Sequence, residues 1–210
     1  MMHGSGREAS AGAALSRPAI PASQGLSWLW QHLREVRQPH ILDCSAISPA
    51  TLSILLDRKA KLFVADLLPV CLDGEAKLWD RTQKVPVFKT SEFLSYFPDV
   101  PPRSLSAILA WNLLDVLPEA ARSAVMDKLF SLLEPLGVLF SILREPSLKS
   151  GVARRWWLES QTQVHVEQDE KKPFPYPPIS NREIEKLTPG GNVKIFLTRS
   201  GRREILAIKG

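Results

Sequence analysis

The sequence predicts an α/β protein in which a mostly parallel sheet is covered by helices on both faces. Helical and strand patterns alternate along most of the 210 residues, which is typical of parallel strands joined by crossover helices. Two short apolar runs, "HILD" and "KLFVAD", each end on an acidic residue, Asp43 and Asp66. Two later apolar runs are separated by the polar stretch "RSGRR", which predicts a closing antiparallel hairpin.

The first half of the chain predicts a tail, an entry helix and two strands joined by a helix. Residues 1–25 are rich in Ala, Ser, Gly and Pro without an apolar period. We therefore expect a flexible N-terminal tail that is dispensable for folding, followed by one domain over residues 26–210. Apolar residues at helical spacing predict a helix over residues 26–36. The other predicted elements are a strand that ends at Asp43, a helix that starts near Pro49 and a buried strand over residues 61–67.

The second half continues this alternation until an irregular segment interrupts it. Residues 85–88 are a candidate third strand, and residues 104–117 contain a fourth strand with Trp111 and Asn112 at its carboxyl end. An amphipathic pattern predicts a helix over residues 118–134, which leads into the apolar strand "PLGVLFSIL". Residues 144–178 are irregular, with the runs "RRWWLES" and "KKPFPYPP". The last predicted elements are the helix "NREIEKL", with Ser180 and Glu183 as a capping box, and two strands over residues 193–198 and 204–209.

Composition argues against several classes of protein. The formal charge of +5 and the pI near 9.4 are modest beside the dense Lys/Arg runs of dedicated nucleic-acid binders. Cys44 and Cys71 form no CxxC pair and no cluster with His, so the sequence predicts neither a metal site nor a disulfide framework. No stretch reaches the roughly 18 apolar residues of a membrane span, and the N-terminus lacks a secretory apolar core. We therefore expect a cytoplasmic protein without a membrane partner.

The turn after the first strand, "SAISP", lacks the glycines of a typical nucleotide-binding turn. Glycine lets a phosphate, ribose or amino-acid group approach bare backbone, and it tolerates positive φ. Ser45, Ile47 and Pro49 stand at these positions instead. Ile47 and Pro49 add bulk where a cofactor would approach, and Pro49 removes one N–H donor. Loss of two charge-assisted hydrogen bonds would weaken a micromolar ligand to about the millimolar range.

The chain resembles the class I S-adenosylmethionine-dependent methyltransferases over about residues 26–210. The stretch "ILDCSAISP" aligns without a gap with the family pattern VLDLGCGTG, and "LEPLGVLF" aligns with LKPGGRLL, where Gly137 is kept and Leu136 replaces its neighbour. The resemblance implies a three-layer, Rossmann-like methyltransferase fold. Its sheet would have seven strands and be mostly parallel, and the C-terminal hairpin would supply the antiparallel strand.

The resemblance also implies where S-adenosylmethionine would bind. Asp43 matches the family acid after the first strand, and Asp66 matches the acid that usually holds the cofactor ribose. Thr90 and Ser91 stand where an acid often meets the adenine. The implied cofactor-binding residues are Asp43, Ser45, Ile47, Asp66, Thr90, Ser91, Trp111 and Asn112. Methyl transfer is an in-line displacement that depends on positioning, so the sequence identifies no catalytic residue.

Two functions from different classes follow from these residues. The presence of Asp43 and Asp66 favours a divergent methyltransferase that acts on an unidentified small-molecule or protein acceptor, whereas the lost glycines favour a non-catalytic binding or scaffold module. A third hypothesis is nucleic-acid binding by the "RRWW" run through stacking and phosphate contacts. The structural interpretation of the same run is that one indole packs on the sheet while Arg154 and Arg155 face solvent.

Overall fold

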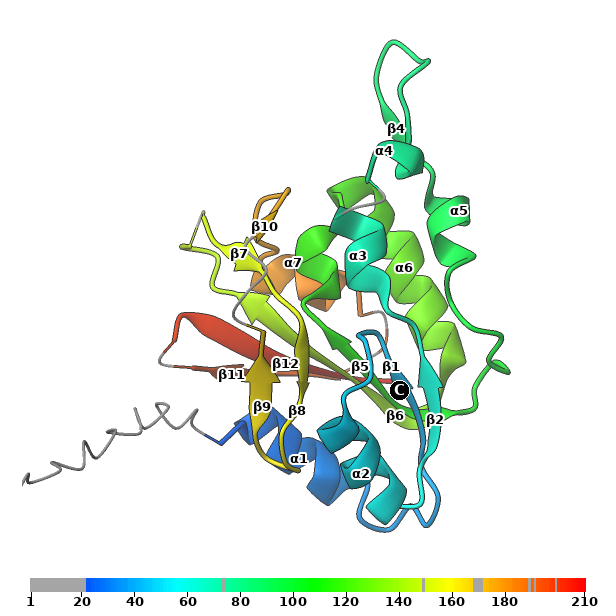
Figure 1. Ribbon diagram of the computed structural model, residues 1–210, viewed down its shortest axis with the longest axis vertical. Coiled ribbons are helices and arrows are strands. Elements are labelled where there is room, and N and C mark those ends of the chain that lie inside the picture. Colours follow the sequence, from blue (N-terminus) through cyan, green and yellow to red (C-terminus); the bar gives the residue numbers. More distant parts are fainter. Residues whose placement is uncertain are drawn as a thin grey trace, which may run out of the picture.

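Six strands form the central sheet of the computed structural model, in the order β11-β12-β6-β5-β1-β2 (Figure 1). The structure describes residues 22–72, 75–148, 150–167, 172–188, 190, 192–198 and 200–210. The strands of this sheet are β1 (His40–Asp43), β2 (Lys61–Val64), β5 (Leu105–Trp111), β6 (Leu133–Arg144), β11 (Asn192–Leu197) and β12 (Arg202–Ile208).

Strand directions match the predicted mostly parallel sheet. β2, β1, β5 and β6 are parallel to one another, and β12 is antiparallel to both β6 and β11. β12 is therefore the one strand of this six-stranded sheet that runs opposite to the rest. β1 lies between β2 and β5, one strand in from the edge of the sheet. The turn that follows it opens at the carboxyl edge of the sheet, where open α/β sheets bind ligands.

The prediction that residues 85–88 form a third strand of the central sheet is wrong. Residues 87–88 form β4 (Val87–Phe88), which pairs with β3 (Trp79–Asp80) in a separate two-stranded ribbon. This ribbon projects from the molecule beyond α4 (Glu75–Leu78), as Figure 1 shows. The apolar run is short, and Val85 and Val87 are exposed, so no apolar surface draws it against β2. The sheet therefore has six strands among the described residues rather than seven.

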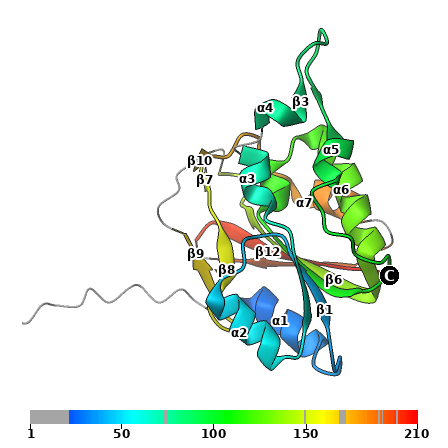
Figure 2. The ribbon, with the colours of Figure 1, turned by 45° about the vertical axis from the view of Figure 1, so that its right-hand side comes forward.

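Helices cover both faces of the sheet and enclose two apolar cores (Figures 1 and 2). On one face, α1 and α2 pack with Ile41, Phe140 and Leu206 of the strands. On the other face, the longer α6 packs with Leu42, Ile108 and Leu139. The helices of the first face are α1 (Gln24–His32) and α2 (Pro49–Asp57), and those of the second are α3 (Leu67–Leu72), α5 (Thr90–Leu94), α6 (Glu119–Leu132) and α7 (Asn181–Lys186), with the 3-10 helix η1 (Leu113–Val116).

The domain begins earlier than residue 26. The Ser23 side chain accepts a hydrogen bond from the Leu26 amide and so caps α1, and the Ser23 amide donates to the Thr162 carbonyl. The Gly25 amide donates to the buried Glu204 carboxylate at 2.7 Å. Residues 23–25 are therefore part of the folded unit, because long-range hydrogen bonds fix them. The rest of the predicted tail, residues 1–21, lies outside the described residues.

Short strands replace part of the segment predicted to be irregular. β7 (Val152–Ala153) pairs with β10 (Lys172–Pro173), and β8 (Trp156–Leu158) pairs with β9 (Val164–Val166). The Ser180 half of the predicted capping box of α7 is confirmed, because the Ser180 hydroxyl accepts from the Glu183 amide at 3.1 Å, whereas the Glu183 carboxylate pairs with Arg122. No helix in the described part of the chain is both long and apolar enough to traverse a bilayer.

Leu136 adopts a backbone conformation that favours glycine, since its φ is 64°. This conformation costs a non-glycine residue about 1–2 kcal/mol. Leu136 is 64% exposed, so the packing of its side chain offsets little of this cost. We expect Leu136→Gly to raise the free energy of unfolding by about 0.5–1 kcal/mol after the chain-entropy cost of glycine, which is about 1–4 °C in Tm. Urea unfolding measures the change. Leu197→Gly is the control, because Leu197 is 70% exposed but lies in a strand, and it should lose stability. A loss in Leu136→Gly would contradict the strain argument.

Candidate functional site

Asp43 ends β1 and is fully buried at the carboxyl edge of the sheet. Its Oδ1 atom accepts two hydrogen bonds, from Trp111 Nε1 at 2.6 Å and from the Ser45 amide at 3.0 Å. Burial raises the pKa of Asp43 from 3.8 to about 7, although both hydrogen bonds favour the ionised form. The other carboxylate oxygen, Oδ2, is buried with no hydrogen-bond partner among the described residues.

Trp111 closes the space above Asp43. It is the last residue of β5, its φ is 48°, and its side chain is 2% exposed. Positive φ is rare for a bulky residue and persists where the surroundings fix it. Here the indole donates to Asp43, and its ring lies edge-on to Phe140 with centroids 5.9 Å apart. The strained backbone thus aims a large side chain at the acid of the first strand.

The cavity that remains beside these residues is very small. Its volume is about 10 Å³, and its lining includes Cys44, Ser45, Leu68 and Trp111. This volume is enough for about one water molecule. Sites for small molecules and cofactors have volumes of about 300–1,000 Å³. The edge above β1 is therefore packed with the protein's own side chains.

The turn after β1 is built as a helix start. The Ser48 side chain accepts from the Thr51 amide and caps α2, and Pro49 occupies the first turn, where a missing N–H costs nothing. Ser45 is buried and Ile47 is 39% exposed. The side chain that covers Asp43 is therefore that of Trp111, whereas the Ile47 side chain lies at the surface.

Asp66 follows β2 and meets a cation from a distant segment. An Asp66 carboxylate oxygen lies 3.5 Å from an Arg155 guanidinium nitrogen, and Arg155 also lies 4.0 Å from Glu167. The side-chain amide of Asn112 donates to the Arg154 carbonyl at 3.2 Å. The "RRWW" run therefore crosses the carboxyl edge of the sheet, from β5 to the end of β2.

This placement confirms one half of the structural interpretation of "RRWW" and corrects the other. Trp156 is buried, as expected for an indole that packs on the sheet. Arg155 is not simply solvated, because it pairs with two carboxylates. Trp157 stacks on His165 with ring centroids 4.6 Å apart, so the second indole is also engaged within the β8–β9 hairpin.

The β8–β9 hairpin is attached to the helix that starts beside the site. The Leu158 amide donates to the Thr51 hydroxyl at 3.0 Å, and this hydroxyl lies 3.4 Å from the Leu158 carbonyl oxygen. Figure 2 shows the hairpin beside α2. Thr51 is fully buried. The hairpin that follows Arg155 is thus held in place by a buried contact as well as by an ion pair.

Thr90 and Ser91 are not brought into this cluster. They start α5, which packs against α4 and α6, and the Thr90 hydroxyl donates to the Phe88 carbonyl at 3.5 Å. The described structure therefore unites Asp43, Ser45 and Trp111, and it places Asp66 and Asn112 under one crossing segment. A role of any of these residues in cofactor binding stays a prediction.

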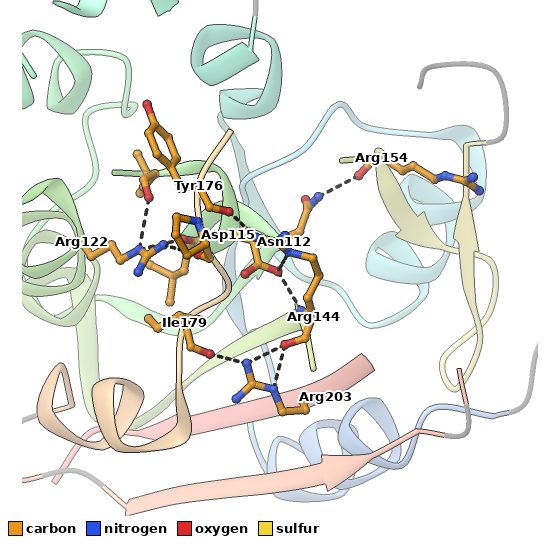
Figure 3. Close-up of polar contacts among 11 residues, drawn as sticks. Asn112, Asp115, Arg122, Arg144, Arg154, Tyr176, Ile179 and Arg203 are labelled. Carbon is orange, nitrogen blue, oxygen red and sulfur yellow. Dashed lines mark hydrogen bonds and ion pairs between the residues drawn. The ribbon is translucent and has the colours of Figure 1, made fainter. Parts of the chain in front are cut away.

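A buried arginine network lies next to the site and was not predicted (Figure 3). Asp115 is fully buried and accepts from the Arg144 amide at 2.7 Å, with the Arg144 guanidinium 3.5 Å away. Burial raises the pKa of Asp115, while the Arg144 contacts oppose this rise. Arg203 donates to the carbonyls of Arg144 and Ile179. The run "RREILAI" indicates the burial of this arginine, since Arg203 shares a strand face with the inward-facing Ile205 and Ala207.

Arg122 completes this network on the other side of Asp115. It donates to the carbonyls of Leu114, Leu117 and Pro177 and pairs with Glu183 at 2.8 Å. Arg122 therefore fastens the chain around residues 177–181 to α6, and Arg203 fastens it to β12. The arginines of this network donate to backbone carbonyls, so the role of the network is structural.

Comparison with known proteins finds similarity in solved structures alone. No model of a protein family matches the chain, and no curated protein matches its sequence. The 1,6-didemethyltoxoflavin-N1-methyltransferase of Burkholderia thailandensis, solved with 1,6-didemethyltoxoflavin and S-adenosylhomocysteine, is 16% identical, with a TM-score of 0.46 over 88% of this chain and 76% of that one.

Two further solved structures have similar scores. A SAM-dependent methyltransferase of Methanosarcina mazei is 15% identical, with a TM-score of 0.43 over 82% of this chain and 93% of that one. The N-methyltransferase NodS of Bradyrhizobium japonicum is 13% identical, with a TM-score of 0.45 over 88% and 93%. At these identities the likeness concerns the fold, and no ligand or residue role passes from them to this chain.

The residues at the carboxyl edge do not fit S-adenosylmethionine in this arrangement. The acid of the first strand is covered by the Trp111 indole, and the acid of the second strand is paired with Arg155. The cavity of about 10 Å³ beside Ser45 and Trp111 is far smaller than a nucleoside.

Proposed function

We propose that this chain is a non-catalytic binding module with a methyltransferase-like fold. The carboxyl edge of its sheet, where the family resemblance places the cofactor, is closed by the protein's own side chains, and we call it the closed cofactor edge. The observation that carries the proposal is the hydrogen bond of 2.6 Å from Trp111 Nε1 to the buried Asp43. This bond places an indole over the acid that the family resemblance assigns to the cofactor. A buried side chain of this size leaves only with a large loss of packing energy, about 3–5 kcal/mol for a tryptophan.

The β8–β9 hairpin adds a second layer to this closure. Arg155 pairs with Asp66, and Leu158 is bound to Thr51 of α2. The ion pair by itself is weak, because partly exposed pairs contribute about 0–1 kcal/mol. The hairpin is held more firmly by the buried contact with Thr51 and by the packing of Trp156 and Leu158 in the core.

A second candidate is methyl transfer from S-adenosylmethionine, and one observation favours it. Asp66 keeps the residue type and the place, directly after the second strand, that suit a ribose contact. Under this alternative, Trp111 and Arg155 would have to move when the cofactor binds. Asp66 would then hold the ribose, and the turn over residues 44–48 would contact the methionine part.

Calorimetry and thermal shift with S-adenosylmethionine and S-adenosylhomocysteine separate the two candidates. For the closed module we expect a change in Tm within about 1 °C at millimolar ligand and no measurable heat of binding. A ligand at about 100 times its Kd would instead stabilise the protein by about 2.7 kcal/mol, or about 5–10 °C in a chain of this size. Micromolar binding that is lost in Asp66→Ala, but kept in the exposed control Asp57→Ala, would replace the proposal with methyl transfer.

A further inference from the structure

A pocket of about 320 Å³ lies on the α1 face of the sheet. It is bounded by the start of α1, the β8–β9 hairpin and the β11–β12 hairpin, which lie together in Figures 1 and 2. Its volume falls within the range of about 300–1,000 Å³ that small-molecule sites have. Asp43, Asp66 and Trp111 are not among its lining residues, so the pocket is separate from the closed edge.

The walls of the pocket suit a flat apolar group. Ile142, Trp156 and Val164 line it and are buried, and Phe196 of β11 adds a second aromatic ring. An apolar lining that includes the aromatic ring of Phe196 favours a ligand with an aromatic body, because rings gain both buried area and ring contacts there.

Arg202 supplies a cation at one side of the pocket. Its guanidinium lies 4.5 Å from the centroid of the Trp156 ring. No carboxylate of the described residues lies within 4 Å of it, whereas Arg122, Arg144 and Arg155 each have such a partner. Burial lowers the pKa of Arg202, and the neighbouring Arg154 lowers it further. An anion bound here would therefore offset an excess of positive charge.

The acid of the pocket, Glu204, is already engaged. It is buried and accepts from the Gly25 amide at 2.7 Å, at the N-terminal end of α1. The positive end of a helix and an amide donor both stabilise a carboxylate. A Cβ on Gly25 would lie 2.8 Å from Phe140 and 3.1 Å from Glu204, so glycine permits this close approach. The charge still open to a ligand is therefore that of Arg202.

We propose that this pocket binds a small aromatic carboxylate, with the ring against the apolar lining beside Phe196 and the carboxylate on Arg202. The proposal goes beyond a closed cofactor edge, because it names a ligand class. It also does not depend on Asp43, Asp66, Trp111 or Arg155, so either proposal stands if the other fails.

Isothermal titration calorimetry of the full chain with 2-naphthoate tests the proposal. For a ligand of this size in a preformed pocket we expect a Kd of about 0.1–1 mM. The neutral 2-naphthamide should bind about 10- to 100-fold more weakly, because it lacks the charge-assisted contact with Arg202. The cationic 2-naphthylmethylammonium should not bind measurably.

Two variants assign the carboxylate contact. Arg202→Gln should remove the preference for 2-naphthoate over 2-naphthamide, and Leu197→Glu should repel 2-naphthoate from the exposed pocket rim with little effect on folding. Lys194→Gln is the matched control, because Lys194 lies on β11 and stacks on Trp28 outside the pocket. It should bind 2-naphthoate like the unmodified chain.

Three results would overturn the proposal. They are no heat of binding with about 10 mM 2-naphthoate, equal binding of acid and amide, or a preference for the cation, which would place Glu204 in control. Titration with S-adenosylmethionine in the same experiment reports separately on the closed edge.

Discussion

Asp43→Asn is expected to stabilise the protein at pH 8 by as much as about 4 kcal/mol. Burial raises the pKa of Asp43 from 3.8 to about 7, and each tenfold change in the proton affinity of a group corresponds to about 1.4 kcal/mol. Between pH 3.8 and about pH 7, Asp43 in the folded state holds a proton that the unfolded chain has released. The contribution of Asp43 to stability is therefore greatest below pH 4, falls as the pH rises, and is lowest above pH 7.

The asparagine variant should escape this loss, because the amide is neutral at every pH and its oxygen accepts the same bonds from Trp111 and Ser45. Urea unfolding from pH 5 to pH 8 should show a gain that grows with pH. Asp127→Asn is the control, since it removes the same charge from an exposed position on α6, and it should change stability by less than about 0.5 kcal/mol. A destabilised Asp43→Asn protein at pH 8 would mean that the site favours the carboxylate.

Arg203→Leu is expected to lower the free energy of unfolding by about 3–5 kcal/mol. Arg203 is fully buried and donates to the Arg144 carbonyl at 2.6 and 3.0 Å and to the Ile179 carbonyl at 2.6 Å. It also donates to the Asn181 side chain. Leucine fits the apolar surroundings but leaves these acceptors without their donor, so the segment before α7 should detach from the sheet.

The expected loss corresponds to a fall in Tm of about 6–20 °C for a chain of this size. Arg34→Leu is the matched control, since its side chain is exposed and pairs only with the adjacent Glu35, and it should lie within about 0.5 kcal/mol of the parent. Hydrogen exchange should show loss of protection in α7 before the sheet. An Arg203→Leu protein whose free energy of unfolding lies within about 1 kcal/mol of the parent would mean that water replaces the lost donor.

Elements with a strong local pattern were predictable from the sequence. β1, β5 and most of β6 are buried on both faces, so their apolar runs identify them, and the Ser180 cap predicts the start of α7. β3 and β4 were not predictable as a ribbon, because each has two residues and depends on its partner rather than on its own pattern. β8 and β9, with three residues each, depend on each other in the same way.

The sequence predicted that polar residues gather at the carboxyl edge of the sheet, but not that Trp111 and Arg155 cover this edge. The acids at the ends of β1 and β2 and the residues after β5 follow from strand boundaries alone. The closure does not, because Trp111 and Asp43 are 68 residues apart and Arg155 reaches Asp66 from a different segment. Loss of glycine indicated a change in the turn, whereas the decisive group lies on another strand with a positive φ that no local pattern reveals.

The position of β12 determines when the fold can form during synthesis. β12 is the last strand along the chain, yet it lies between β6 and β11 and supplies the Glu204 carboxylate for Gly25, 179 residues away. Until residues 202–208 leave the ribosome, the long apolar β6 has an unpaired edge and α1 lacks its anchor. Such non-local pairing slows folding, and an open apolar edge invites association with other chains. A chain that ends within the β11–β12 hairpin would therefore be aggregation-prone, because β11 joins the described sheet through β12 and the sheet would lack both strands.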